Sequence, residues 1–454
     1  MIVAIVAVMA VGVFYLFGRD KDACRDVIPQ DATAVAMFEP ADFLEQLGFA
    51  PNKAGKLVMN LEDVAEGIDL SNPVYAFVSE NGLSGITLNV RDVDKLLKAF
   101  SASGYASEEQ RGYQWVADKN SIGCIDKDKM LLCGPVSEME QDALRSEMVR
   151  LMTQGHHSVP VFEKAKQQKG VLRLCTSLAN LPKMYSIPLP DGIDPSHAFL
   201  SAALRIDEKA VVFSIEVEGA GNISLPYGPI QGDWIGMLPA KPFARFCANM
   251  KGEELLLNLR EVPELRTALL ALNMCVDADM MIKAIDGDVA LVVPKLDFQH
   301  PDFLFTAKLA NTDFLANADE WSQVQRTGAQ NFIIEYEGKQ AYFGVHEGCL
   351  YVAFSPVTAD MACQKSDADD FLQAAKGKYL SASLDVGQVI DAYPNQGVAI
   401  LLKTLPQVRE ITNAFECVSL AADSPQRIEL SIQTNKPVKE IVQNLWSLLT
   451  GLNL

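Results

Sequence analysis

Short apolar runs separated by polar turns recur along most of the chain. Residues 112–136 hold three such runs, and residues 333–357 hold three more. The turns fall at residues 118–120, 126–129, 338–339 and 347–348. Apolar runs of this length between turn residues are typical of β-strands joined by hairpins. Each block therefore predicts a three-stranded antiparallel meander.

The two meander blocks align at a constant offset of 221 residues, the difference between Gly123 and Gly344. The same offset matches Pro135 with Pro356, Val136 with Val357, Leu88 with Leu309 and Asp92 with Asp313. With small gaps, further strand-like segments match, namely 73–79 with 288–294, 169–171 with 376–378 and 211–215 with 428–432. A shared frame of this length predicts an internal duplication, with Gly123 and Gly344 at equivalent strand positions and Pro135 and Pro356 ending the same strand.

Amphipathic helices lie between the predicted strands. Asp92 is placed to cap one helix, and Ser137 with Glu140 forms a capping box before another. Interleaved strands and helices with short hairpins predict an α+β fold of two tandem related lobes. Each lobe is expected to be a mostly antiparallel sheet that includes the meander and carries its helices on one face.

One predicted helix, at residues 436–452, has no counterpart in the first half. Pro437 opens it, and its apolar residues recur at helical spacing. We expect this amphipathic helix to pack on the second lobe. The alternative is a helix for a partner or a membrane surface, but Lys436, Lys439 and Glu440 make its polar face only weakly basic.

Residues 1–18 begin with an uninterrupted apolar run that is just long enough to cross a bilayer as a helix. A cleaved signal peptide would have a basic start and a small-residue exit site, and a lipoprotein would have small residues rather than Lys21-Asp22 before Cys24. We therefore predict one transmembrane anchor at 1–18 and favour an uncleaved one, while cleavage stays open. Arg19, Lys21 and Arg25 would by the positive-inside tendency favour a cytoplasmic body, so the orientation stays open.

The remaining boundaries follow from glycine and proline content. Residues 219–233 are the stretch dense in both, which is typical of a linker. We expect a juxtamembrane segment at 19–26, a first repeat lobe at 27–218, the linker at 219–233, and a second repeat lobe with the C-terminal helix at 234–454.

Composition and charge narrow the possible partners. Of 454 residues, 49% are hydrophobic and 21% charged, which is ordinary for a folded protein. The 39 Lys and Arg against 58 Asp and Glu give a formal charge of -19. Such a surface repels phosphate backbones, so nucleic acid is not expected as a partner.

The nine cysteines show no CxxC spacing and predict no disulfide framework. Cys124 and Cys133 lie in one predicted hairpin. A turn at Asp128-Lys129 would place them opposite each other, whereas a turn centred on Lys127-Asp128 would pair Cys124 with Leu131. We favour two free thiols, because the aligned Val345 and Phe354 are not cysteines.

No motif in the sequence carries catalytic chemistry. The His156-His157 pair follows a helix stop and fits a solvated loop, and the acidic residues 367–370 lack the spacing of a calcium loop. Asp286-Gly287-Asp288 fits a turn, and the methionines 139, 148 and 152 fit core positions. We therefore predict no catalytic, cofactor-binding or metal residues and no cofactor.

The opening of the soluble part resembles a known family. Ile28-Pro29-Gln30-Asp31-Ala32, followed by a strand and a short helix at 40–48 and later by the 73–79 block, is similar to uncharacterised envelope proteins of Bacteroidales that have only a domain-of-unknown-function label. The resemblance implies display on the periplasmic or outer-envelope side. It implies no catalytic residues.

Together these features predict a single-pass, membrane-tethered envelope protein with a periplasmic or otherwise extracytoplasmic body. We expect it to bind or scaffold another envelope protein or a ligand, at the groove between the lobes, and not to be an enzyme. The alternative is a hydrolase whose site is assembled from scattered residues. Convergent titratable side chains would favour the hydrolase, and a broad apolar surface would favour the binding module.

Overall fold

The computed structural model describes residues 24–49, 66–155, 157–180, 194–219, 227–232, 242–297, 300–321, 323–336, 338–363, 370–388, 410 and 413–450. The chain divides into two compact units. Unit 1 comprises Met1–Asn222 and Lys436–Leu454, and unit 2 comprises Ile223–Asn435. Both mix helices with antiparallel strands, so the predicted α+β class is confirmed.

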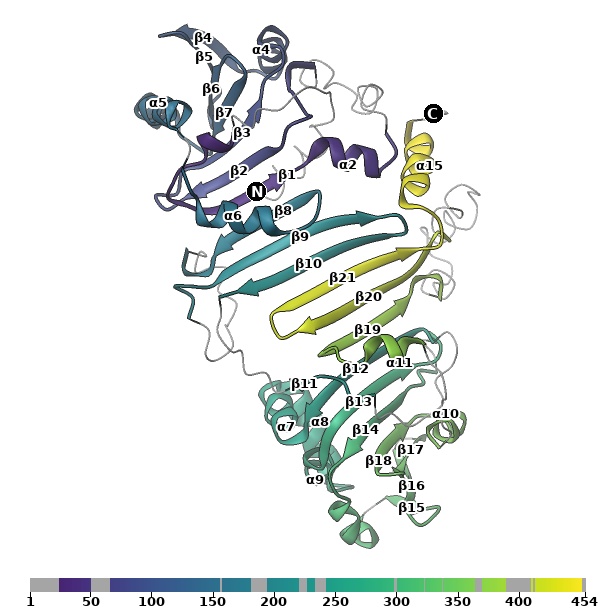
Figure 1. The fold of residues 1–454 in the computed structure, drawn as a ribbon. Helices are drawn as coiled ribbons and strands as arrows, with labels where there is room; N and C mark the ends of the chain where they lie inside the picture. Colours follow the sequence, from purple (N-terminus) through teal and green to yellow (C-terminus); the bar gives the residue numbers. More distant parts are fainter. Residues whose placement is uncertain are drawn as a thin grey trace. The chain divides into compact units, whose positions relative to one another are not determined.

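The described residues of unit 1 form ten strands. They are β1 (Ala32–Phe38), β2 (Val74–Ser79), β3 (Ser84–Asn89), β4 (Ala106–Gln110), β5 (Tyr113–Ala117), β6 (Ile122–Asp126), β7 (Lys129–Cys133), β8 (Leu172–Ser177), β9 (Phe199–Asp207) and β10 (Ala210–Glu218). Its helices are η1 (Arg25–Val27), α2 (Pro40–Gln46), α4 (Val93–Ala102), α5 (Glu138–Thr153), α6 (Pro160–Gln167), η3 (Leu178–Asn180) and α15 (Val438–Thr450). Figure 1 labels most of these elements.

All strand pairs of unit 1 are antiparallel. The order across the sheet is β4-β5-β6-β7-β3-β2-β1-β8-β9-β10. The predicted meander forms β5, β6 and β7. The helix starts are also as predicted, because an Asp92 carboxylate oxygen accepts from the Lys95 amide at 3.1 Å and the Ser137 hydroxyl donates to Glu140 at 2.6 Å.

Helices cover both faces of this sheet, so the expectation of helices on one face is wrong. Neighbouring residues of β7 point to opposite cores. Leu131 packs with Phe162 of α6 and Met148 of α5, whereas Met130 packs with residues of α2, α4 and α15. The physical reason is that the central strands are apolar at consecutive positions, which requires burial on both sides.

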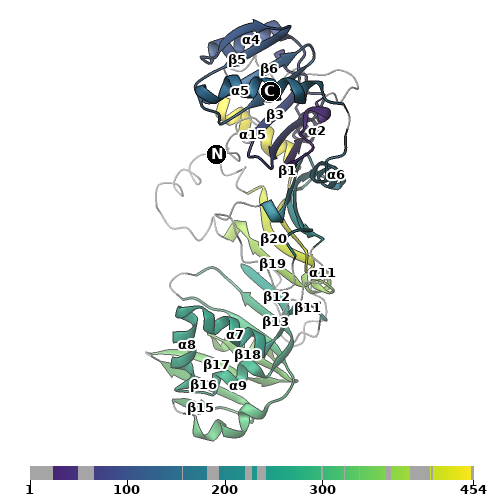
Figure 2. The same ribbon diagram turned by 90° about the vertical axis from the view of Figure 1, so that its left-hand side faces the viewer.

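Unit 2 has the strands β11 (Tyr227–Gly228), β12 (Ala244–Lys251), β13 (Ile285–Val293), β14 (Leu304–Leu309), β15 (Val324–Arg326), β16 (Asn331–Tyr336), β17 (Lys339–His346), β18 (Cys349–Ala353), β19 (Leu380–Asp385), β20 (Phe415–Ser424) and β21 (Arg427–Thr434). Its helices are α7 (Gly252–Glu261), α8 (Pro263–Asn273), α9 (Ala278–Lys283), η5 (Asp313–Glu320), α10 (Pro356–Ala362) and α11 (Asp370–Ala375). Figure 2 shows α7, α8 and α9 gathered beside its strands.

The strand order of unit 2 equals that of unit 1. It runs β15-β16-β17-β18-β14-β13-β12-β19-β20-β21, with the short β11 added beside β12. Each strand of unit 1 thus has a counterpart at the same place, β1 matching β12 and β8 matching β19. The helices that follow the meanders, α5 and α10, both begin with a capping box.

The expected equivalence of Gly123 and Gly344 is wrong by one residue. The turn after β6 joins Asp126 to Lys129, and the turn after β17 joins His346 to Cys349. Counted from these turns, Gly123 is three residues away and Gly344 two, which places them on opposite faces of their strands. The hairpin turns fix the register of each strand, so they determine which residues are equivalent even where two glycines match in the sequence.

The two prolines also differ in position. Pro135 lies between β7 and Ser137, the N-cap of α5, whereas Pro356 is the first residue of α10. Neither proline ends its strand, because β7 ends at Cys133 and β18 at Ala353, so the expectation that both end the same strand is wrong. A proline is favoured at either place, since it fits a turn as well as the first helical position.

The C-terminal helix belongs to unit 1 and not to the second lobe. In α15 the Val438 amide donates to the Glu208 carbonyl at 2.8 Å, and the Gln443 side chain donates to the Gly48 carbonyl at 2.7 Å. Val438 is buried in the core that holds Leu44 and Leu47 of the α2 region. The helical stripe was predicted correctly, but a stripe alone does not identify the surface that it covers.

The predicted anchor at 1–18 and juxtamembrane residues 19–23 lie outside the described residues. Within the described ranges, none of the helices has the length and apolar character needed to span a bilayer. Of the predicted linker, Gly219 and residues 227–232 are described, and Tyr227–Gly228 form β11, which pairs with Asn249 and Met250 at the end of β12 in unit 2.

Candidate functional site

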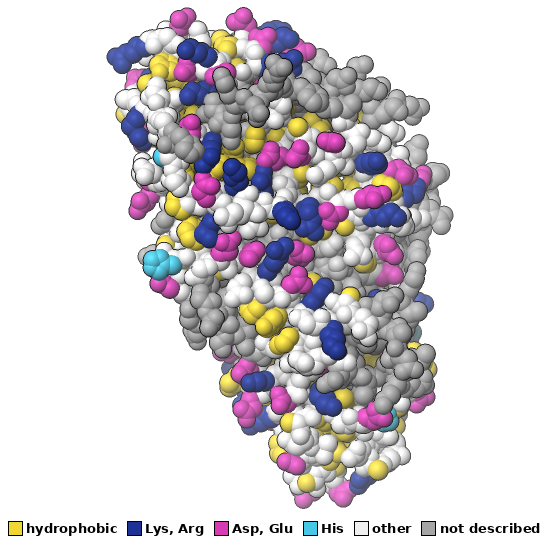
Figure 3. All heavy atoms as spheres, in the orientation of Figure 1, with side chains coloured by type: hydrophobic (Ala, Val, Ile, Leu, Met, Phe, Trp, Pro, Cys, Tyr) yellow, Lys and Arg dark blue, Asp and Glu magenta, His cyan; other side chains and the backbone are white. Residues whose placement is uncertain are grey.

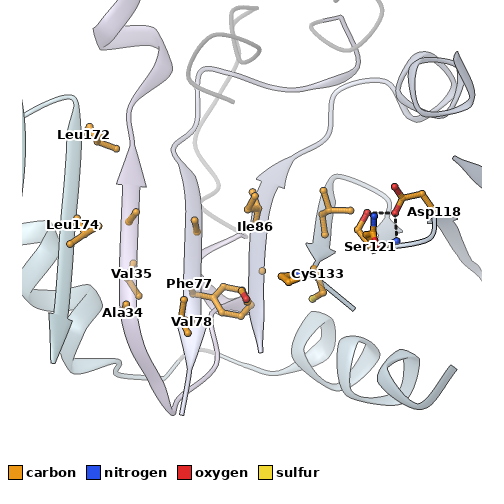
Figure 4. A pocket seen from close by; sticks show the side chains of 18 of the residues that line it. Ala34, Val35, Phe77, Val78, Ile86, Asp118, Ser121, Cys133, Leu172 and Leu174 are labelled. Atoms are coloured by element: carbon orange, nitrogen blue, oxygen red, sulfur yellow. Dashed lines mark hydrogen bonds between the residues drawn. The ribbon is translucent and has the colours of Figure 1, made fainter. Parts of the chain in front are cut away.

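A cavity of about 650 Å³ lies on the sheet of unit 1 (Figure 4). Small residues form its floor at the centre of the sheet. Ala36 of β1 and Ala76 of β2 are direct register partners, and Ala34 lies two residues along β1. Because side chains alternate along a strand, these alanines share one face and leave space that larger residues would fill.

Larger apolar side chains form the walls. Ile86 of β3 and Leu132 of β7 line one side, and Leu172 and Leu174 of β8 line the other. Leu174 is 37% exposed, so the wall on this side is open to solvent. The cavity thus crosses five neighbouring strands with an almost wholly apolar surface.

One end of the cavity is polar. Figure 4 shows Asp118 and Ser121 at the end opposite Leu172 and Leu174. The Ser121 hydroxyl donates to the Asp118 carboxylate at 2.7 Å and lies 2.9 Å from the Tyr105 hydroxyl. The Asn120 amide also donates to Asp118, at 3.0 Å.

Two titratable groups near this end have shifted pKa values. Burial alone would raise the pKa of Asp118, but hydrogen bonds from Ser121 and from backbone amides outweigh it and hold the pKa below its usual value. The side chain of Cys133 lies with Leu131 in the core on the other side of the sheet, where burial raises the pKa of its thiol to about 12, so the thiol is protonated and does not face the cavity. The described lining contains no histidine to act as a base. The cavity is therefore suited to holding a ligand.

Unit 2 has a smaller groove on the matching strands. It measures about 310 Å³ and is lined by residues of β12, β13, β19 and β20, among them Phe246, Leu291 and Ala382. Leu291 and Ala382 are the register partners of Phe246 on its two neighbouring strands. The two units thus place apolar hollows on equivalent strands.

Of the three methionines expected in the core, Met148 and Met152 are buried, but Met139 is 92% exposed at the start of α5, so that expectation is wrong for Met139. The ring nitrogens of His157 lie 2.8 Å from the Ile28 carbonyl and 3.0 Å from the Gly155 carbonyl, which ties its loop to the first described segment. Asp288 lies inside β13 rather than in a turn, and its carboxylate accepts from the Gly232 amide and from the Asn249 side chain. His156 and acidic residues 367–369 lie outside the described residues. Among those described, no group of His, Cys, Asp and Glu is placed to hold a metal ion.

The preferred interpretation of Cys124 and Cys133 is confirmed. The turn is centred on Lys127 and Asp128, so Cys124 pairs with Leu131 and Cys133 with Ile122. Both thiols are free and buried. The physical reason is the register, which separates the two cysteines along the hairpin.

These two thiols are expected to resist alkylation in the folded protein. Burial raises the pKa of each to about 12, with Asp126 adding to the effect at Cys124. Neither is therefore ionised at pH values well below 12, and neither is accessible. Peptide mapping after iodoacetamide treatment should find them unmodified and unlinked, while the exposed Cys363 is modified. Recovery of a linked Cys124–Cys133 peptide would contradict the register.

Charged side chains of both signs are mixed on the face seen in Figure 3. Lys and Arg side chains there alternate with Asp and Glu side chains over both units. The excess of acidic residues is thus spread among basic ones on this face, which offers no continuous basic surface for a polyanion.

Three solved structures that align with this chain are distant likenesses of it. No family model and no curated protein matches the chain. Two crystal forms of TP0453, I and III, align with TM-scores of 0.29 and 0.30 at 14% identity, covering 46% of this chain and 81% and 84% of theirs. A DnaN sliding clamp from Bartonella birtlesii bound to griselimycin aligns with a TM-score of 0.09 at 12% identity, covering 89% of this chain and 99% of the clamp. Likenesses at these TM-scores support no statement about the function of this chain.

Proposed function

We propose that this chain is a membrane-tethered envelope protein that binds an apolar ligand and does not catalyse a reaction. The observation that carries the binding role is the cavity of unit 1, with its alanine floor and leucine walls. Its volume of about 650 Å³ lies within the range of small-molecule sites, roughly 300–1,000 Å³. The tether is the apolar segment at 1–18, and the body lies on the extracytoplasmic side.

The lining favours binding over the alternative hydrolase. Hydrolysis requires a nucleophile or an activated water beside a base of suitable pKa. Here the Cys133 thiol is buried on the other side of the sheet with a pKa of about 12, and the Asp118 carboxylate is engaged with Ser121 and the Asn120 amide. A groove between the two lobes stays a prediction from the sequence.

We also infer that the two units arose by duplication. The support is the equal order of ten strands and the apolar hollows on β1, β2 and β8 and on β12, β13 and β19. On this proposal, the groove of unit 2 is a related but smaller site.

Filling the cavity tests the binding role. Replacing Ala76 by Phe puts an aromatic ring on the floor opposite Ala36. With Nile red as a neutral apolar probe, we expect the dissociation constant of the tightest site to rise at least about tenfold, or about 1.4 kcal/mol. Fluorescence titration measures the change.

A matched substitution controls for the added ring. Ala421 is a half-buried strand residue of unit 2 that does not line either hollow, so Ala421→Phe should leave the tightest site unchanged. Circular dichroism checks that both variants fold. Equal probe affinity in folded Ala76→Phe and the unaltered protein would rule out the cavity as the binding site.

A further inference from the structure

The cavity of unit 1 has the form of a trough. Its lining comes from β8, β1, β2, β3 and β7, which are consecutive in the sheet. Neighbouring strands lie about 4.8 Å apart, so the four intervals span roughly 19 Å. A trough of this length with an apolar floor fits one extended hydrocarbon chain better than a compact ring system.

The polar end has hydrogen-bond acceptors to spare but few donors. A hydroxyl has one proton, and the Ser121 hydroxyl gives its proton to the Asp118 carboxylate. Ser121 must then accept from Tyr105, whose own proton is used in that bond. The lone pairs of Tyr105 and Asp118 remain, and a ligand group that donates hydrogen bonds would satisfy them in place of water.

The charge at this end is negative. Asp118 is the one charged residue among the described residues that line the cavity, and no Lys or Arg is among them. Its hydrogen bonds favour the ionised form, as its lowered pKa reflects. Ser84 and Asn120, the other polar lining residues, are neutral. A carboxylate or phosphate placed here would meet repulsion without a compensating cation.

Resting on the proposed function, we infer that the ligand is a long-chain amphiphile whose head group donates hydrogen bonds and is not anionic. The chain lies over Ala34, Ala36 and Ala76 toward Leu172 and Leu174. The head, an amide, hydroxyl or ammonium group, lies against Tyr105 and Asp118. A fatty-acid anion or an anionic phospholipid is disfavoured at this end.

Three probes with the same chain test the head group. Oleamide, oleyl alcohol and oleate, at a pH where oleate is ionised, are titrated against bound Nile red. We expect oleamide and the alcohol to displace the dye at concentrations at least about tenfold lower than oleate does, because of the Asp118 charge. Oleate binding as tightly as oleamide overturns the head-group inference and leaves the cavity as a binding site. If none of the three displaces the dye, the proposed function itself fails.

Two variants test whether Asp118 and Tyr105 cause the expected preference for oleamide over oleate. Asp118→Asn keeps an oxygen that can accept from Ser121 but removes the charge, and should reduce the oleate-to-oleamide ratio of dissociation constants severalfold. Tyr105→Phe removes an acceptor without changing charge, and should weaken oleamide more than oleate. Asp142→Asn makes the same charge change at an exposed position of α5 and should leave the ratio unaltered. An unchanged ratio in folded Asp118→Asn overturns the role given to the carboxylate.

Discussion

Ending the chain at Asn435 should lower the free energy of unfolding of unit 1 by about 3–6 kcal/mol. The truncation removes α15, in which Val438 and Ile441 are only 5% and 6% exposed. Each fully buried aliphatic side chain contributes about 1.5–3 kcal/mol, and a folded domain has only about 5–15 kcal/mol in total. Hydrogen-exchange mass spectrometry should show faster exchange in β9 and around α2, while the peptides of unit 2 keep their protection.

Point substitutions test whether the loss of buried side chains, and not the shortening of the chain itself, causes the destabilisation. Val438→Ala with Ile441→Ala should reproduce a large part of the effect, since both remove buried methyl groups. Lys439→Ala, on the exposed side of the same helix, should change stability by no more than about 0.5 kcal/mol. Unaltered exchange in unit 1 after truncation would mean that α15 contributes nothing to its core.

Gly252→Ala should destabilise unit 2 by an amount near the upper end of the roughly 1–3 kcal/mol usual for overpacking. Gly252 begins α7, and a methyl group there would lie 1.8 Å from the Ile282 carbonyl oxygen and 3.0 Å from that of Ile285. Both obstacles are backbone atoms, so relief requires α7 to move away from α9 and β13. Thermal unfolding should show a midpoint lower by several degrees.

Gly155→Ala is the matched control, because a methyl group at Gly155 meets no atom within 4 Å and its backbone is not left-handed. It should leave the melting temperature almost unchanged. A Gly252→Ala protein as stable as the Gly155→Ala protein would show that α7 does not pack as closely as described. Hydrogen exchange measured for individual peptides should show the effect of Gly252→Ala in unit 2 alone, just as the effect of the α15 truncation should appear in unit 1 alone.

Local signals explain which features could be predicted from the sequence. The Ser137–Glu140 capping box and the Asp92 cap depend on residues three apart, and both formed as expected. The meander from Tyr113 to Cys133 depends on turns of a few residues. Such features are determined by neighbouring residues, and tertiary contacts did not override them.

The features that were missed depend on contacts between distant residues. A strand with apolar residues on both sides, such as β7, gives no sign of which helices will cover each side, and the stripe of α15 fits any apolar surface. The cavity depends on Ala36 and Ala76 meeting across two strands forty residues apart. Separate alanines in a sequence look like ordinary small core residues, so the cavity can be recognised only once the strand register that places them side by side is known.

Because α15 belongs to unit 1 but is synthesised after unit 2, unit 1 cannot complete its core until translation is almost finished. A ribosome that has finished residue 222 must still add the whole of unit 2 before it reaches residue 436. At roughly 5–20 residues per second, the 213 residues of unit 2, from 223 to 435, take about 10–40 s. During that interval Leu44 and Leu47 lack the helix that later covers them. The first unit to emerge is thus the last to be completed, and its open core is where a chaperone would be needed.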